Sequence, residues 1–90
     1  MLTLEDCIAL SDLTEEEIEA IAEHEHIPEI LAAEYGSYLV HLPGGRKAIK
    51  AIIRDDIANA QARGDYEHSG KLKLVLRHFI KHSRASATPH

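Results

Sequence analysis

Hydrophobic residues recur along most of the chain every three or four positions, and no stretch alternates between apolar and polar residues as a half-buried strand does. This spacing predicts amphipathic helices joined by short breaks. The predicted helices cover residues 4–10, 15–26, 28–42, 46–63 and 66–82. The pattern therefore predicts an all-α fold, a compact bundle of four main helices plus a short N-terminal helix.

Local signals mark the ends of these helices. Thr14 and Glu17 form a capping-box pattern before the second helix, and Pro28 suits the first turn of the third. Gly64 is a typical C-terminal cap, and Asp65 caps the next helix directly after it. Because this joint is so short, we expect the last two helices to form an antiparallel hairpin.

The third predicted helix contains an interior glycine, Gly36, one turn after Ala32. Such a glycine costs roughly 1 kcal/mol of helix stability relative to alanine. Either it lets another helix approach closely or it is simply tolerated, and the pattern leaves both readings open.

The chain of 90 residues is expected to form one helical domain over residues 1–82 and a flexible C-terminal tail over residues 83–90, which are small and polar. Its one cysteine, Cys7, excludes an intrachain disulfide and favours a reducing, cytoplasmic setting. The first residues lack the basic and apolar regions of a signal peptide, and no apolar run approaches the roughly 20 residues that span a membrane. A soluble protein with no membrane association is expected.

The two halves of the chain carry opposite charge. The first 45 residues contain eleven Asp or Glu and no Lys or Arg, whereas the remainder contains ten Lys or Arg and four Asp or Glu. Segregation of this kind indicates that one half lies against the other, within one chain or across a dimer.

Four ionisable residues fall on predicted apolar faces. Asp56 lies within the isoleucine stripe of the fourth helix, and Glu25, Glu34 and His68 lie on the apolar faces of the second, third and fifth helices. An ionised carboxylate among isoleucines must find partners or change its pKa, because desolvation is costly. One reading is a hydrogen-bonded polar network in a small core. The alternative is that these groups converge on a metal ion.

A segment with two histidines, Glu23 to His26, also suggests metal binding. Glu23-x-x-His26 has the carboxylate–histidine spacing of ferritin-like metal helices, although that architecture needs two copies and one is present. Oxygen-rich ligands with one or two imidazoles suit iron, manganese or zinc. The structural reading requires no cofactor, and the alternative places a divalent metal on Glu23, His26, Glu34, Asp56 and His68.

Basic residues recur about once per turn on the last two helices and form two ridges. They are Arg46, Lys50 and Arg54 on the fourth helix and Lys73, Arg77 and Lys81 on the fifth. Such ridges could contact phosphates, so nucleic-acid binding is a second alternative. An acidic chain with a pI near 5.7, no tryptophan and one phenylalanine disfavours it.

Three apolar residues point away from the main hydrophobic faces of their helices: Leu39, Val40 and Leu74. Unless they contact the short first helix, they form a patch suited to self-association. Together with the opposite charges of the two halves, this favours a homodimer or another protein partner. The predicted interaction residues are these three and the basic residues Arg46, Lys50, Arg54, Lys73, Arg77 and Lys81.

The segments LSDLTEEEIEAIAEHEHIPEI and KLKLVLRHFI resemble short bacterial helical proteins of unknown function. The resemblance covers most of the chain and brings no family motif or activity with it. No nucleophile elbow, phosphate loop or dinucleotide fingerprint is present, so an enzyme is not expected. The function that we predict is a non-enzymatic protein-interaction or assembly module.

Overall fold

A computed structural model describes the backbone of residues 3–87 and the side chains of residues 3–82. This part of the chain is all-helical and contains no strand. The helices are α1 (Leu4–Leu10), α2 (Glu15–Glu25), α3 (Glu29–Val40), α4 (Gly45–Ala62) and α5 (Tyr66–Ala87). The all-α prediction is confirmed.

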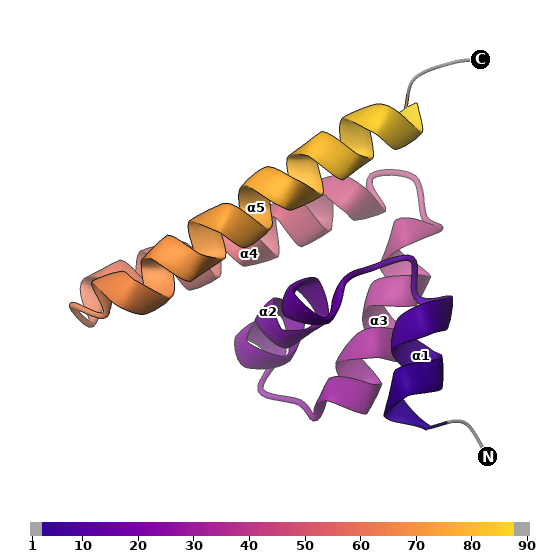
Figure 1. The fold of residues 1–90 in the computed structure, drawn as a ribbon, viewed down its shortest axis with the longest axis horizontal. Helices are drawn as coiled ribbons and strands as arrows, with labels where there is room; N and C mark the ends of the chain where they lie inside the picture. The colour runs from indigo at the N-terminus through magenta and orange to yellow at the C-terminus, as the bar shows by residue number, and fades with distance from the viewer. Residues whose placement is uncertain (1–2, 88–90) are drawn as a thin grey trace.

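The helices form a flat molecule. Its shortest dimension is 18 Å, less than twice the diameter of about 10–12 Å that a helix has with its side chains, so two layers at most are stacked. α4 and α5 lie side by side along most of their length, α2 and α3 pack against one side of this pair, and α1 packs on α3 (Figure 1). α2 contacts α3, α4 and α5, and α4 contacts α2, α3 and α5, so these two helices connect the two parts of the molecule.

Capping hydrogen bonds stabilise the N-termini of α1 and α2. Thr14 Oγ1 accepts from the Glu17 N–H at 3.2 Å, while Glu17 Oε1 accepts from the Thr14 N–H at 2.9 Å. Thr3 and Asp6 make the same reciprocal pair before α1. These bonds satisfy amides that the first turn of a helix leaves without partners.

The turn between α4 and α5 depends on Gly64. Its φ of 76° lies in the left-handed region that glycine adopts without strain, and the Asp65 N–H then donates to the Ala60 carbonyl at 2.9 Å. α5 continues to Ala87, beyond the predicted end at His82. Residues 88–90 of the predicted tail lie outside the described residues, and the division into a domain and a tail stays a prediction.

α3 turns a different face to the core than its pattern predicts. Its buried residues are Ala32, Ala33, Gly36 and Leu39, whereas Tyr38 is 63% exposed. The predictions that Leu39 points outward and that Glu34 points inward are both wrong, because Leu39 is 8% exposed and Glu34 lies at the surface.

Close packing explains this choice of face. A Cβ atom added to Gly36 would lie 2.5 Å from Leu13 Cδ1 and 3.0 Å from Ile21 Cδ1. The small residues of α3 therefore let it approach α2 and the loop before α2 more closely than its larger side chains would allow. Of the two readings of Gly36, the structure supports close approach.

The core consists mainly of isoleucines of α2 and α4, with Leu72 and Phe79 from α5. Within the described residues, no helix is both long enough and apolar enough to cross a membrane.

Candidate functional site

One carboxylate lies fully inside this core. Asp56 is 1% exposed on the buried face of α4, between Ile52 and Ile53 on one side and Ile57 and Ala60 on the other. Its Oδ2 atom is buried and has no hydrogen-bond partner. The predicted inward position of Asp56 is confirmed, but the hydrogen-bonded network that would make it an ordinary core residue is missing.

Charged side chains of three helices surround this position. Near the end of α2, Glu23 Oε1 lies 2.6 Å from Nε2 of His68, which comes from the first turns of α5. His24 lies between two carboxylates, with Nε2 2.7 Å from Oδ2 of Asp55 and Nδ1 2.6 Å from Oε2 of Glu25. These pairs link α2 to α4 and α5 across the end of the core. We call Glu23, His24, Asp55, Asp56 and His68 the polar cluster.

The electrostatics of the polar cluster follow from burial and from its excess of carboxylates. Burial raises the pKa of Asp56 to about 7, the negative charges of Glu23 and Asp55 add to the rise, and His24 and His68 oppose it. Burial lowers the pKa of His24, but its hydrogen bonds to Glu25 and Asp55 raise it more, so the net shift is upward. Asp56 therefore changes its protonation near neutral pH.

The polar cluster contains three of the five predicted metal ligands: Glu23, Asp56 and His68. The other two lie elsewhere, because His26 is the exposed cap of α2 with a φ of 57° and Glu34 is exposed on α3. Glu25, which was expected on the apolar face of α2, is exposed and contacts the polar cluster only through His24.

His24 is missing from the predicted ligand set. A signal for it exists in the sequence, because His24 follows Ile21 by three positions and so lies on the side of the helix that carries Ile21. The choice of His26 followed from spacing to Glu23 alone. In the structure the backbone of His26 is left-handed and ends α2, so this residue does not continue the helix face of Glu23.

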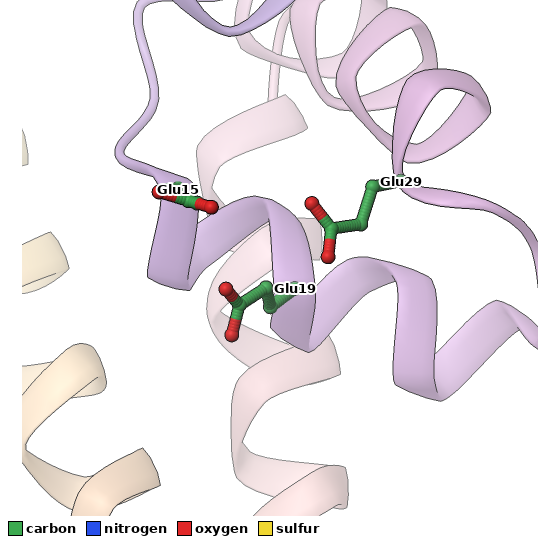
Figure 2. Close-up of side chains that lie close together, drawn as sticks. All are labelled: Glu15, Glu19 and Glu29. Atoms are coloured by element: carbon green, nitrogen blue, oxygen red, sulfur yellow. The ribbon is translucent and has the colours of Figure 1, made fainter. Parts of the chain in front are cut away.

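A second group of carboxylates lies at the surface. Glu15 and Glu19 of α2 and Glu29 of α3 point toward one another (Figure 2), and one oxygen of each lies within 4.8 Å of the other two. Burial raises the pKa of Glu19, and the neighbouring charges of Glu29, Glu15 and Glu16 raise it further, opposed by Lys71. Among the described residues no other three potential ligands lie this close together.

An apolar groove runs between α2 and α5. It encloses about 300 Å³, its floor and walls include Ala20, Leu72, Leu74 and Val75, and Glu23 and His68 of the polar cluster lie at its border. A further hollow of about 260 Å³ continues it toward Thr14 and His78 and shares Glu16, Leu74 and Val75 with it. We call the two together the α2/α5 groove.

Leu74 is the most exposed of the predicted apolar interaction residues, with 66% of its surface accessible. Val40 is half-buried and packs against the core. Arg46 is half-buried, with its guanidinium 5.8 Å from the centre of the Phe79 ring. Lys50 and Arg54 line a shallow hollow on α4, while Lys73, Arg77 and Lys81 are exposed on α5.

Direct ion pairs contribute little to the contact between the acidic and basic halves in the described part of the chain. Apart from Arg46, no lysine or arginine within residues 3–82 lies within 4.0 Å of a carboxylate oxygen, and the ion pairs found there all involve histidine. The two halves nevertheless lie against each other within one chain, because α2 contacts α4 and α5 and α3 contacts α4. The positive charge of Lys71 on α5 also acts on Glu19 of α2. Contact across a dimer stays a prediction.

The site has to be interpreted from its own geometry, since no family model, curated protein or solved structure matches the chain.

Proposed function

We propose that this chain is a cytoplasmic protein-interaction module of four helices and a short N-terminal helix, with α4 and α5 as an antiparallel hairpin, and that it assembles as a homodimer through the α2/α5 groove. The observation that carries the proposal is the exposure of Leu74 beside a groove with apolar walls. An exposed leucine is unremarkable alone, but an exposed leucine on a continuous apolar groove is typical of an interaction surface.

Charge favours a second copy of this chain as the occupant. The α2 side of the groove carries Glu16, Glu19 and Glu23. On a helix with about 100° per residue, Arg77 and Lys81 lie within about 60° of Leu74. A partner that places its own Leu74 in the groove thus brings two cations toward the acidic side of α2.

Such an arrangement is consistent with two-fold symmetry. Each copy offers the same groove and the same leucine, so the contact that one makes is repeated by the other, as in most homodimers. The exposed charges, which find few partners within the chain, acquire them between chains. Electrostatic attraction of this kind adds to the rate and specificity of association more than to affinity.

The test is sedimentation velocity on Leu74→Glu and on Leu10→Glu. Leu10 is a matched control because it is 64% exposed on α1 and does not line the α2/α5 groove. Removing a buried leucine contact costs about 1.5–3 kcal/mol, so Leu74→Glu should weaken dimerisation by at least about tenfold. Leu10→Glu should dimerise like the natural chain.

Added salt should also weaken the dimer, because it screens the pairs between copies. A natural chain that remains monomeric at high protein concentration and low salt would refute the proposal. Equal dimerisation of Leu74→Glu and the natural chain would show that the interface lies elsewhere.

A further inference from the structure

The polar cluster carries more negative charge than its imidazoles can neutralise. Two histidines, His24 and His68, serve the three carboxylates of the polar cluster, Glu23, Asp55 and Asp56, and the exposed Glu25 also bonds to His24. Glu23, Asp55 and Glu25 are already bound to an imidazole nitrogen, and Asp56 is left with a buried oxygen that accepts no hydrogen bond. With His24 protonated, His68 neutral as a metal ligand has to be, and the three carboxylates of the polar cluster ionised, the cluster carries a net charge of −2, which a single divalent cation would cancel.

We propose that Glu23, Asp56 and His68 bind a divalent transition-metal ion between α2, α4 and α5, with His24 held beside it by Asp55. The assignment is independent of dimer formation, since all these residues come from one chain. It keeps three of the residues predicted from the sequence and replaces His26 and Glu34 with residues of the polar cluster.

The Glu23–His68 pair already has the shape of two ligands that share one ion. Their Oε1 and Nε2 atoms lie 2.6 Å apart and point at each other. An ion held at about 2.0–2.2 Å from each ligand atom separates neighbouring ligand atoms by roughly 3–3.5 Å, so the pair needs to open by only about 1 Å. The cation then takes the place of the proton that the two side chains share.

Asp56 supplies the second negative charge. Its carboxylate does not yet form a group of three ligand atoms within 4.8 Å together with Glu23 and His68, so loading requires a side-chain rotation at Asp56 or at the pair. The gain is large for this residue, because the ion would give a partner to a buried oxygen that has none. Asp55 orients His24 through a bond of 2.7 Å, as carboxylates commonly do for imidazoles at metal centres.

The donor set selects the class of ion. Two carboxylates and one or two imidazoles suit Zn²⁺, Mn²⁺ or Fe²⁺, whereas Ca²⁺ and Mg²⁺ prefer oxygen ligands alone. Cys7 lies on the buried face of α1 and is not part of the polar cluster, so no thiolate favours Cu⁺. An ion can enter from solvent through the α2/α5 groove, where Glu23 and His68 lie at the border.

The competing carboxylate group serves as the internal control. Glu15, Glu19 and Glu29 lie closer together, but Glu15 and Glu19 are exposed, Glu29 is half-buried, and none of the three has a buried oxygen without a partner. Acidic clusters of this kind are common at protein surfaces without a bound ion. The double variant Glu19→Gln/Glu29→Gln removes two of its charges and leaves the polar cluster intact.

The experiment is a titration of tag-free, chelator-treated protein with ZnCl₂ and, separately, with MnCl₂, followed by calorimetry and by native mass spectrometry for stoichiometry. We expect one ion per chain for at least one of the two metals. Asp56→Asn should weaken that binding by at least about tenfold, and His68→Gln should do the same through a different helix. Glu19→Gln/Glu29→Gln should bind like the natural chain.

Melting temperature supplies a second measurement that separates folding from binding. Since only the folded chain carries the site, the metal should raise Tm of the natural chain and leave Tm of Asp56→Asn unchanged. Absence of stoichiometric binding by both metals would overturn the proposal. Retention of binding in both Asp56→Asn and His68→Gln would overturn it as well, as would loss of binding in the Glu19→Gln/Glu29→Gln variant alone.

Discussion

Among residues 3–82 two carboxylates are buried, Glu17 and Asp56, and each has one oxygen without a hydrogen-bond partner. Their surroundings nevertheless give them different roles. Glu17 is 2% exposed, but its Oε1 closes the capping box with Thr14, at a helix start where the dipole favours negative charge. Asp56 lies in the middle of α4, far from either helix end, and accepts no hydrogen bond at its buried oxygen. Glu17 is therefore held in the fold through its Oε1, although its Oε2 has no hydrogen-bond partner, whereas Asp56 has no such capping role and calls for a functional explanation.

The first residue-scale prediction concerns pH in the metal-free protein. The pKa of Asp56 is about 7 when folded and near 3.8 when unfolded, so the folded chain binds the extra proton between these values. The free energy of unfolding should consequently fall as pH rises from about 4 to about 7 and level off above. At about 1.4 kcal/mol per pKa unit, the loss is on the order of 4 kcal/mol at most.

Urea unfolding of the natural chain and of Asp56→Asn, both with chelator, isolates this contribution. Asparagine has the same shape and no charge, so the variant should be the more stable of the two at pH 8, and the difference should shrink at pH 5. Asp12→Asn is the matched control, because Asp12 is exposed and its left-handed backbone suits asparagine. A stability difference between Asp56→Asn and the natural chain that does not vary with pH would contradict the prediction.

At the scale of single helices, the hydrophobic pattern and the observed packing disagree most in α3. α3 carries apolar side chains on all its faces. Its core face is made mainly of small residues, whereas its larger side chains are partly or largely exposed: Ile30, Leu31, Tyr35 and Tyr38. Close approach decides which face of α3 is buried. The many van der Waals contacts of two tightly packed helices compensate for leaving the larger apolar side chains of α3 partly exposed. Gly36 is the residue that makes this approach possible.

Gly36→Ala should therefore destabilise the protein even though alanine favours helix. The new methyl group would overlap Leu13 Cδ1 and crowd Ile21 Cδ1, both of which belong to tightly packed residues. Overpacking of this kind typically costs about 1–3 kcal/mol, which lowers Tm by several degrees in a domain of this size.

The matched control for this substitution is Gly70→Ala in α5, where a Cβ atom would meet nothing within 4 Å. It should stabilise the protein by up to about 1 kcal/mol through helix propensity alone. Thermal unfolding followed by circular dichroism checks both variants. If the two substitutions shift Tm in the same direction, close packing at Gly36 is not the deciding factor.

At the scale of the whole molecule, charge is separated between regions rather than balanced locally. α2 carries a row of glutamates along the groove, and α5 carries the exposed cations Lys73, Arg77 and Lys81. Surface charges of opposite sign that do not meet within one molecule are available for contact between molecules. This gives the proposed dimer an electrostatic component that can be tested apart from Leu74.

Charge exchange tests that component. Glu16→Lys and Arg77→Glu should each weaken the dimer by a few-fold, because an exposed ion pair contributes about 0.2–1 kcal/mol. The double variant should recover most of the loss, since it restores the pair with its signs exchanged. Lys50→Glu changes net charge as Arg77→Glu does, but on α4, and should leave the dimer unchanged. Dissociation constants from sedimentation equilibrium provide the comparison, and a double variant weaker than either single one would exclude this pairing.

Much of the local structure could be predicted because its causes are local. The capping box at Thr14 and the left-handed Gly64 each depend on residues within a few positions, and the structure has them where the pattern predicts them. The isoleucine stripe of α4 is regular enough that the burial of Asp56 follows from periodicity alone. The end of α5 could not be placed, because small polar residues neither favour nor break a helix strongly.

The sequence by itself thus determined the helices, their caps and the intrusion of one carboxylate into an apolar face, since hydrogen-bonding capacity and helical spacing are properties of neighbouring residues. Only the tertiary structure decided that α3 packs through its small residues, that Leu39 is buried, and that Glu23 and His68, 45 positions apart, lie 2.6 Å from each other. The physical reason is that such contacts depend on the relative rotation of whole helices. Close packing sets that rotation for all helices together, and no single helix pattern contains it.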